Sequence, residues 1–255
     1  MDIATLAGIG MALVGILGSM IIEGSSPMAI VLIPPMMLVF LGTFGAAIAG
    51  GTLADAKALP LLMKKALMAK VSPPDESVEL LVRLAEKARR EGLLALEDEV
   101  SKIEDPFLKR ALEMAVDGTD SSAVAEILGA AVETKRSDDN RAAKILADMG
   151  GFAPTIGIIG TVIGLIHVLG NLAEPAELGE QIASAFVATL WGVLTANVFW
   201  FPMANRLKRI SGLECARMDL AVEGVLAIQD GSNPRLVEAK LNSLLPGAAA
   251  NKDAA

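Results

Sequence analysis

Lysine and arginine are absent from two long stretches of this 255-residue chain, residues 1–56 and 145–205. All 22 of these basic residues lie in the two remaining blocks, 57–144 and 206–252. The stretches without basic residues are strongly apolar, and each is long enough for two membrane spans of about 20 residues. Because cytoplasmic loops carry an excess of Lys and Arg, this pattern predicts four spans and soluble parts that lie in the cytoplasm.

The predicted spans cover residues 3–22, 27–51, 149–172 and 182–203. We expect the first to be a retained span and not a signal peptide, because no basic residues precede it and a second span follows at once. No strand pattern is visible. The predicted fold is an all-α polytopic membrane protein with four transmembrane helices and a helical cytoplasmic domain, with both termini in the cytoplasm.

The chain divides into four predicted segments. These are a transmembrane hairpin at 1–51, a cytoplasmic helical domain at 52–148, a second transmembrane hairpin at 149–203, and a cytoplasmic helical tail with a disordered end at 204–255. We expect residues 52–70 to continue inward from the second span and a short helix over about 93–103. Asp105-Pro106 is typical of a helix start. Thr119 or Asp120 is expected to cap a long helix that runs into the third span, and the tail helix breaks near 231–234.

Several functional classes find no support in the composition. Cys215 is the only cysteine and His167 the only histidine, so we predict neither a metal site nor a catalytic site. The central block is dense in both charge signs, which suits a protein partner better than nucleic acid. We therefore expect a protein that is not an enzyme and does not bind nucleic acid.

The spans carry no Asp, Glu, Lys or Arg near their midplanes. Ion pumps and proton relays normally keep an ionisable group inside the membrane. Either this chain moves no ions, or a partner chain supplies the carboxylate.

The third and fourth spans each present a face of small and hydroxyl-bearing residues. The third-span face comprises Gly157, Gly160, Thr161, Gly164, His167 and Asn171, and the fourth-span face comprises Ala185, Ala188, Thr189, Gly192, Thr195 and Ala196. Such faces allow close helix packing, and their hydroxyls can also line an ion path. Both interpretations remain open at this point.

Proline and histidine in the spans also have two interpretations each. Pro154 and Pro202 lie near membrane boundaries, where they act either as hinges or as kinks that set packing angles. The Pro34-Pro35 pair is expected to shape the second span. His167 is either a proton shuttle or, as we expect, a neutral hydrogen-bonded side chain.

Three motifs resemble those of the MotA/PomA flagellar stator proteins, and the likeness covers nearly the whole chain. They are GFAPTIGIIGTVIGLI at 151–166, AFVATLWG at 185–192 followed by Pro202, and ARREGLLALE at 88–97. The related TolQ/ExbB proteins share the glycine-rich third span, but they have three spans and lack the 89–97 motif.

The resemblance implies a homopentamer around two copies of a single-span MotB/PomB-type partner, in the bacterial inner membrane and in contact with its lipids. The partner's aspartate would carry the coupling ion, H⁺ or Na⁺, and no other cofactor is implied. Thr161 and Thr189, with Gly157, Gly160 and Ala188, would form the ion path. Pro154 and Pro202 would couple ion binding to movement. Thr161 resembles sodium-type members and Ala188 does not, so the ion stays open.

The same resemblance assigns a contact surface for the rotor protein FliG. Its residues would be Arg89, Arg90, Glu97, Asp98 and Glu99. Without the resemblance, the two arginines would be interpreted as a solvated helix face. The alternatives are a TolQ/ExbB-like energiser of envelope transport and a membrane scaffold without ion flux.

Overall fold

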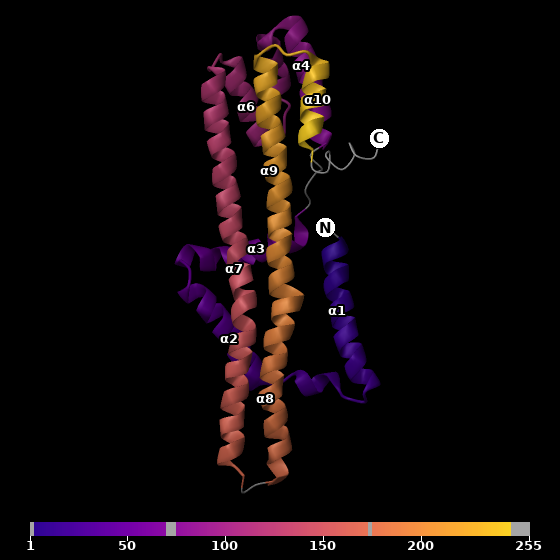
Figure 1. Ribbon diagram of the computed structural model, residues 1–255, viewed down its shortest axis with the longest axis vertical. Coiled ribbons are helices and arrows are strands. Elements are labelled where there is room, and N and C mark those ends of the chain that lie inside the picture. The colour runs from indigo at the N-terminus through magenta and orange to yellow at the C-terminus, as the bar shows by residue number, and fades with distance from the viewer. Residues whose placement is uncertain (1–2, 70–74, 173–174, 246–255) are drawn as a thin grey trace. The chain divides into compact units, whose positions relative to one another are not determined.

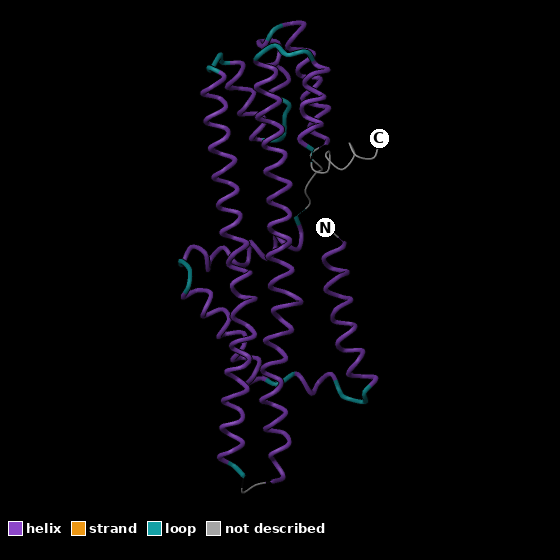
Figure 2. Tube along the Cα trace, viewed as in Figure 1, coloured by secondary structure: helices purple, strands orange, loops and turns teal. Residues whose placement is uncertain are grey.

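The chain is built from helices, and the described residues contain no β-strand (Figures 1 and 2). The structure is a computed structural model that describes residues 3–69, 75–172 and 175–245. The helices in chain order are α1 (Ile3–Ile22), η1 (Pro27–Ile30), α2 (Ile33–Ala49), α3 (Leu53–Met68), α4 (Asp75–Glu91), η2 (Leu93–Leu96), α5 (Glu97–Val100), α6 (Pro106–Val116), α7 (Ser121–Gly170), α8 (Pro175–Thr195), η3 (Ala196–Trp200), α9 (Phe201–Gln229) and α10 (Pro234–Leu244). The predicted all-α class is confirmed, and the protein is a polytopic membrane protein.

The described residues form two compact units. Unit 1 comprises residues 1–70 and 140–208, and unit 2 comprises residues 71–139 and 209–255. Helices α7 and α9 contribute residues to both units. These units divide the chain by contacts and not by membrane topology, so the four predicted segments remain predictions.

Unit 1 holds the apolar helices. α1, the apolar part of α7 and the apolar part of the α8–α9 rod are each long enough to cross a membrane, and α2 is a shorter apolar helix. At 50 residues, α7 is about 75 Å long. A buried core of Leu146, Met149, Trp200, Met203 and their neighbours joins α2, α3, α7 and the η3–α9 segment within unit 1, and it includes no residue of α1.

The second apolar segment is shorter than predicted. Ser26 caps the 3₁₀ helix η1, and α2 starts only at Ile33. The prediction of one continuous span over 27–51 was therefore wrong in its extent. Proline lacks a backbone N–H and is tolerated in the first turn of a helix, so Pro34-Pro35 sets the start of α2.

The segment after α2 does not continue the same helix, contrary to the prediction for residues 52–70. Two glycines, Gly50 and Gly51, follow α2, and Thr52 starts a new helix. The Thr52 hydroxyl accepts a hydrogen bond from the Asp55 N–H at 3.2 Å, and the Thr52 N–H donates to Asp55 Oδ2 at 2.8 Å. This reciprocal capping box satisfies backbone groups at the helix start. It also lowers the pKa of Asp55 through the hydrogen bond from the Thr52 backbone.

Unit 2 largely follows the predicted helix boundaries. Asp105 Oδ1 accepts hydrogen bonds from the backbone at the start of α6, and Asp120 Oδ1 accepts one at 2.9 Å from the Ser122 N–H at the start of α7. The tail helix breaks between α9 and α10 as expected. The expected helix over 93–103 is reduced to η2 and the one-turn α5. The tail end that was expected to be disordered, 246–255, lies outside the described residues.

The fourth span contains an irregular turn that the sequence did not indicate. The rod from α8 to α9 widens into a π-helix, η3, immediately before Pro202. Phe201 donates its backbone N–H to the Ala196 carbonyl, five residues earlier. Single-turn π-segments of this kind occur often at functional sites.

Candidate functional site

Helices α7 and α8 contact each other through their main chains, because glycine lies at each close approach. A Cβ on Gly157 would lie 2.8 Å from the Ala188 carbonyl oxygen, and one on Gly192 would lie 2.5 Å from the Ala153 carbonyl oxygen. Real Cβ atoms do not approach other atoms so closely. The small-residue faces therefore serve close packing, and whether they also line an ion path stays a prediction.

Two threonine hydroxyls meet at this crossing. The Oγ1 atoms of Thr161 in α7 and Thr189 in α8 lie within hydrogen-bonding distance of each other. Thr161 Oγ1 also lies 3.2 Å from the Gly157 carbonyl oxygen and 3.1 Å from that of Ala185. Thr189 Oγ1 lies 3.2 Å from the same Gly157 oxygen. The structure thus brings together the five residues predicted for the ion path: Gly157, Gly160, Thr161, Ala188 and Thr189.

This threonine cluster, defined by Thr161, Thr189 and the carbonyls of Gly157 and Ala185, has more acceptors than donors. Each hydroxyl has one hydrogen to donate and two lone pairs. The cluster's contacts outnumber its two hydroxyl hydrogens. Uncharged oxygens with free lone pairs suit a hydrogen-bond donor or a hard cation. Both threonines are half-buried, so another chain or an ion can reach them.

The two prolines predicted as hinges lie within continuous helical rods. Pro154 is inside α7, and Pro202 follows η3. A proline removes the donor to the carbonyl four residues earlier, which for Pro154 belongs to Gly150. Gly150 packs on the ring of Phe201, whose Cδ1 would lie 2.8 Å from a Cβ at that glycine. The structure therefore brings the turn before Pro154 against the neighbour of Pro202, and the hinge role stays a prediction.

His167 has a hydrogen-bond partner on its own helix. Asn171 Nδ2 lies 3.3 Å from His167 Nε2 and donates to the His167 carbonyl at 3.1 Å. The expected hydrogen bond is present, although the partner lies on the same helix and the imidazole is exposed. Its protonation state remains a prediction.

Trp191 ties α8 to the start of the second apolar segment. Its indole Nε1 donates to the Ile30 carbonyl at 2.6 Å, and its ring packs on Phe40 with centroids 5.9 Å apart. This anchor was not predicted. The only signal for it in the sequence is that a buried tryptophan N–H normally needs an acceptor.

In unit 2, the predicted partner-contact residues surround a sharp turn. Arg89 and Arg90 lie in the last turn of α4, and Glu97 and Asp98 lie in α5. Gly92 between them has φ of +89°, a conformation that favours glycine. All four charged side chains are exposed. Within the described parts of the chain, Arg90 pairs with Glu86 at 3.6 Å, whereas Arg89, Glu97 and Asp98 form no ion pair.

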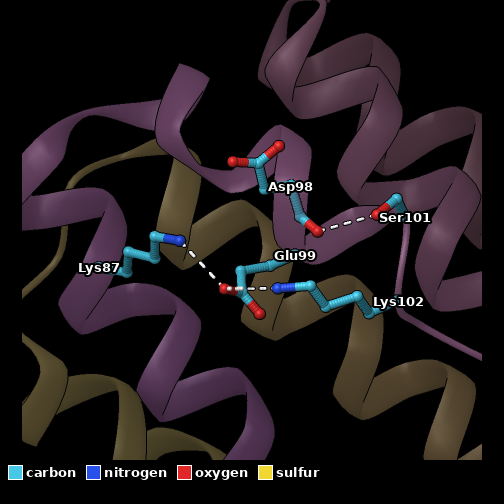
Figure 3. A network of polar contacts seen from close by, with 5 residues as sticks. All are labelled: Lys87, Asp98, Glu99, Ser101 and Lys102. Atoms are coloured by element: carbon cyan, nitrogen blue, oxygen red, sulfur yellow. Dashed lines mark hydrogen bonds and ion pairs between the residues drawn. The ribbon is translucent and has the colours of Figure 1, made fainter.

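Glu99 differs from the other predicted contact residues (Figure 3). Its carboxylate accepts from Lys87 Nζ at 3.1 Å and from Lys102 Nζ at 3.5 Å. The hydrogen bond from Lys87, with the charge of Lys102, lowers the pKa of Glu99. Figure 3 shows the Asp98 carboxylate pointing away from this pair. Glu99 therefore holds α5 against α4, and the charges left for a partner are those of Arg89, Glu97 and Asp98.

One apolar residue of this turn was missed by sequence reasoning. Leu94 in η2 is 72% exposed, whereas Leu96 in the same short helix is fully buried. Leu94 lies in the chain between the basic and acidic residues of the turn. We predict that this exposed leucine adds apolar area to the contact surface that the resemblance assigns to the turn.

Comparisons with known proteins agree with this geometry. Residues 99–220 match the model of the MotA/TolQ/ExbB proton channel family. The chain is 36% identical to Motility protein A of Bacillus subtilis over 247 residues, which is 96% of this chain and 92% of that protein. The chain belongs to the MotA/PomA family. It is also 30% identical to the chemotaxis protein PomA of Vibrio alginolyticus, over 96% of both chains.

Two solved structures resemble this MotA/PomA-family chain over nearly its full length. A chain of the C. jejuni MotAB structure matches with a TM-score of 0.92 and 30% identity, over 96% of each chain. A chain of the flagellar MotAB stator complex from Bacillus subtilis matches with a TM-score of 0.89 and 36% identity, over 99% of this chain and all of that one. The sequence-based family assignment is confirmed.

Proposed function

We propose that this chain is the ion-conducting stator subunit of a bacterial flagellar motor and works with a MotB-type single-span partner. The observation that carries the proposal is the whole-length likeness to subunits of MotAB stator complexes. We further propose five copies around two partner chains in the inner membrane, with both termini in the cytoplasm and a FliG-type rotor protein as the second partner.

The threonine cluster supports an ion site to which this chain and its partner chain each contribute different ligands. Its oxygens are uncharged, and the predicted spans supply no carboxylate near the midplane. A bare charge inside a membrane is costly, so a coupling ion needs both a counter-charge and polar ligands. We propose that the partner's aspartate supplies the charge and that Thr161 and Thr189 supply neutral oxygens for H⁺ or Na⁺.

The charged turn in unit 2 supports a contact that is made and broken in each step. Exposed ion pairs contribute roughly 0–1 kcal/mol each. A rotor protein held by Arg89, Glu97 and Asp98 would therefore be released at low cost. Several such weak contacts, and not one strong contact, suit a surface that must transmit torque and then move on.

The first experiment is deletion of the gene in its own host, followed by microscopy of cells with stained filaments. Cells that build filaments but cannot rotate them support the stator proposal. Normal swimming without any second stator gene would contradict it. Swimming speed of rescued cells in sodium-free medium then separates H⁺ from Na⁺ as the coupling ion.

A matched pair of variants tests the ion path. Thr161→Val keeps the side-chain shape and removes the hydroxyl from the threonine cluster. Thr155→Val is the control, because Thr155 is on the same helix and, among the described residues, its exposed hydroxyl bonds only to the Phe152 carbonyl, at 2.8 Å. We expect Thr161→Val to assemble but to lose most ion conduction, and Thr155→Val to conduct normally. Equal ion conduction by both variants would contradict the proposal that Thr161 is part of the ion path.

A TolQ/ExbB-type energiser is the second candidate, because the matched family model includes those proteins. An energiser has no rotor to contact. Loss of nutrient uptake or envelope integrity in the deletion strain, with normal filament rotation, would favour this candidate.

A further inference from the structure

A cleft of about 390 Å³ lies in unit 2 between α5 and α6. Its volume falls in the range of about 300–1,000 Å³ that is typical of small-molecule sites, so it has room for side chains of a partner. The lining combines charged and apolar side chains, and comprises Glu97, Val100 and Ser101 on the α5 side and Lys109, Glu113, Val116 and Asp117 on the α6 side. All of them lie within the described range 75–172.

The amphipathic pattern of α6 produces this cleft. One face of α6 is buried in the core of unit 2, through Leu108, Ala111, Leu112 and Ala115. Lys109, Glu113 and Asp117 follow one another at intervals of four residues, so they share a second face, which lines the cleft. Val100 is 5% exposed and belongs to the same core. The cleft therefore has a fixed apolar floor and a charged, solvent-exposed rim.

The rim carries more negative than positive charge. The carboxylates of Glu97, Glu113 and Asp117 share the cleft with one ammonium group, that of Lys109. None of these four side chains forms an ion pair with a residue that the structure describes. A lysine four residues before a glutamate is the less favourable order for a helical ion pair, in agreement with the unpaired Lys109 and Glu113. On the other side of the same short helix, Glu99 is paired with Lys87.

Two of these carboxylates lie where a helix least favours negative charge. Glu113 is in the last turn of α6, Asp117 is the C-cap residue, and that turn contains no basic residue. The C-terminal end of a helix carries a partial negative charge of its own, which attracts cations. A positively charged group in the cleft would therefore interact favourably with both carboxylates and with the carbonyl end of α6.

A side chain fits this cleft better than a metal ion does. Within the described ranges, no three Asp, Glu, His or Cys residues lie close enough together to hold a metal. Arginine and lysine place a charged end group on a long apolar stem. In the cleft, the stem can pack on Val100 and Val116 while the end group pairs with Glu113 or Asp117. Glu97 lines the same cleft and is also a predicted rotor-contact residue.

We infer that this cleft binds an arginine or lysine side chain of the FliG-type rotor protein, and that Glu113 and Asp117 belong to the rotor contact together with Glu97. This inference rests on the proposed function, because it extends the contact surface assigned there. Lys109 repels the incoming cation and weakens the contact. That effect suits a contact that must be broken at every step.

The test uses cells that lack the native gene and express the full chain together with its single-span partner. A photo-crosslinking amino acid replaces Ser101, whose exposed side chain lines the cleft. Its cross-link to the FliG-type rotor protein is measured by immunoblot, and fluorescent foci report assembly. Glu113→Gln with Asp117→Asn removes two charges and keeps the side-chain shapes. Glu126→Gln with Glu238→Gln is the matched control, because both residues are exposed and lie outside the cleft lining.

We expect Glu113→Gln with Asp117→Asn to lower the cross-link yield about fivefold, since two weak exposed ion pairs are lost. The control should keep the yield of the wild type. Lys109→Gln should raise the yield, because it removes the cation that lines the cleft. Loss of a merely structural contact would not move these variants in opposite directions.

Equal yields from the two double variants would overturn the inference, and so would a lower yield in Lys109→Gln. If the wild-type chain restores filament rotation but residue 101 gives no cross-link to the rotor protein, the cleft contact is wrong and the proposed stator function stands. Normal rotation in cells that lack this gene and any second stator gene would instead contradict the proposed function itself.

Discussion

Replacing Gly192 by alanine should destabilise the contact between α7 and α8. The new Cβ would lie 2.5 Å from the Ala153 carbonyl oxygen and 3.2 Å from the Gly157 Cα. Both atoms belong to the main chain, so no side chain can rotate away. The two helices would have to separate by about 0.9 Å to reach ordinary contact, and overpacking of this kind costs about 1–3 kcal/mol.

Helix propensity acts in the opposite direction. Alanine is more favourable than glycine inside a helix by about 1 kcal/mol. A clash with two backbone atoms should lie at the upper end of the overpacking range, which leaves a net loss of about 1–2 kcal/mol. For a chain of this size that corresponds to a lowering of Tm by about 2–8 °C. The shift would also pull the Thr161 and Thr189 hydroxyls apart, so ion conduction should fall with stability.

The assay is the thermal midpoint of the detergent-solubilised complex. Gly45→Ala is the control, because Gly45 is exposed in the middle of α2 and its Cβ would meet nothing within 4 Å. This variant gains the same propensity without a clash, so its Tm should stay level or rise. A Tm for Gly192→Ala equal to or above that of Gly45→Ala would refute the close-approach argument.

Three further predictions concern unit 2. Reversing both charges, with Arg89→Glu and Glu97→Arg, should reduce torque in tethered cells while the stator still assembles as fluorescent foci; unchanged swimming would count against the rotor contact. Lys135 Nζ pairs with Asp139 at 2.7 Å and with Glu214 at 2.6 Å, so Lys135→Ala should lower the free energy of unfolding by about 1–2 kcal/mol. The exposed Lys102→Ala should lower the free energy of unfolding by less than about 0.5 kcal/mol. A hydrogen bond from the Ser122 hydroxyl, with backbone N–H donors, lowers the pKa of Asp120 below its ordinary 3.8, so the stability that its charge adds is present above that pH and lost as pH falls through the lowered pKa. The Tm difference between wild type and Asp120→Asn should therefore shrink on acidification, and a constant difference would contradict the assignment.

Features that depend on local sequence were predicted well. The helix starts at Asp105 and Asp120 follow from side chains that bond to backbone groups two or three residues away. The apolar helices follow from hydropathy over about 20 residues. The two errors in unit 1 also have local causes, the proline pair at the start of α2 and the glycine pair with the Thr52 cap before α3, which the hydropathy pattern does not register.

The sequence by itself determined the helical class, the apolar segments, the small-residue faces and the absence of membrane-embedded charge, because each depends on residues close together in the chain. Only the tertiary structure decided that Thr161 meets Thr189, 28 residues away, and that Trp191 bonds to Ile30, 161 residues away. It also decided that Glu99 pairs with Lys87, and that Arg89 forms no ion pair with any residue that the structure describes. The physical reason is that hydrophobicity determines whether a helix lies in a membrane or a core, but it does not determine the rotation of the helix about its axis or its displacement along that axis. Those are set by which glycines let two backbones approach, and that depends on both helices at once.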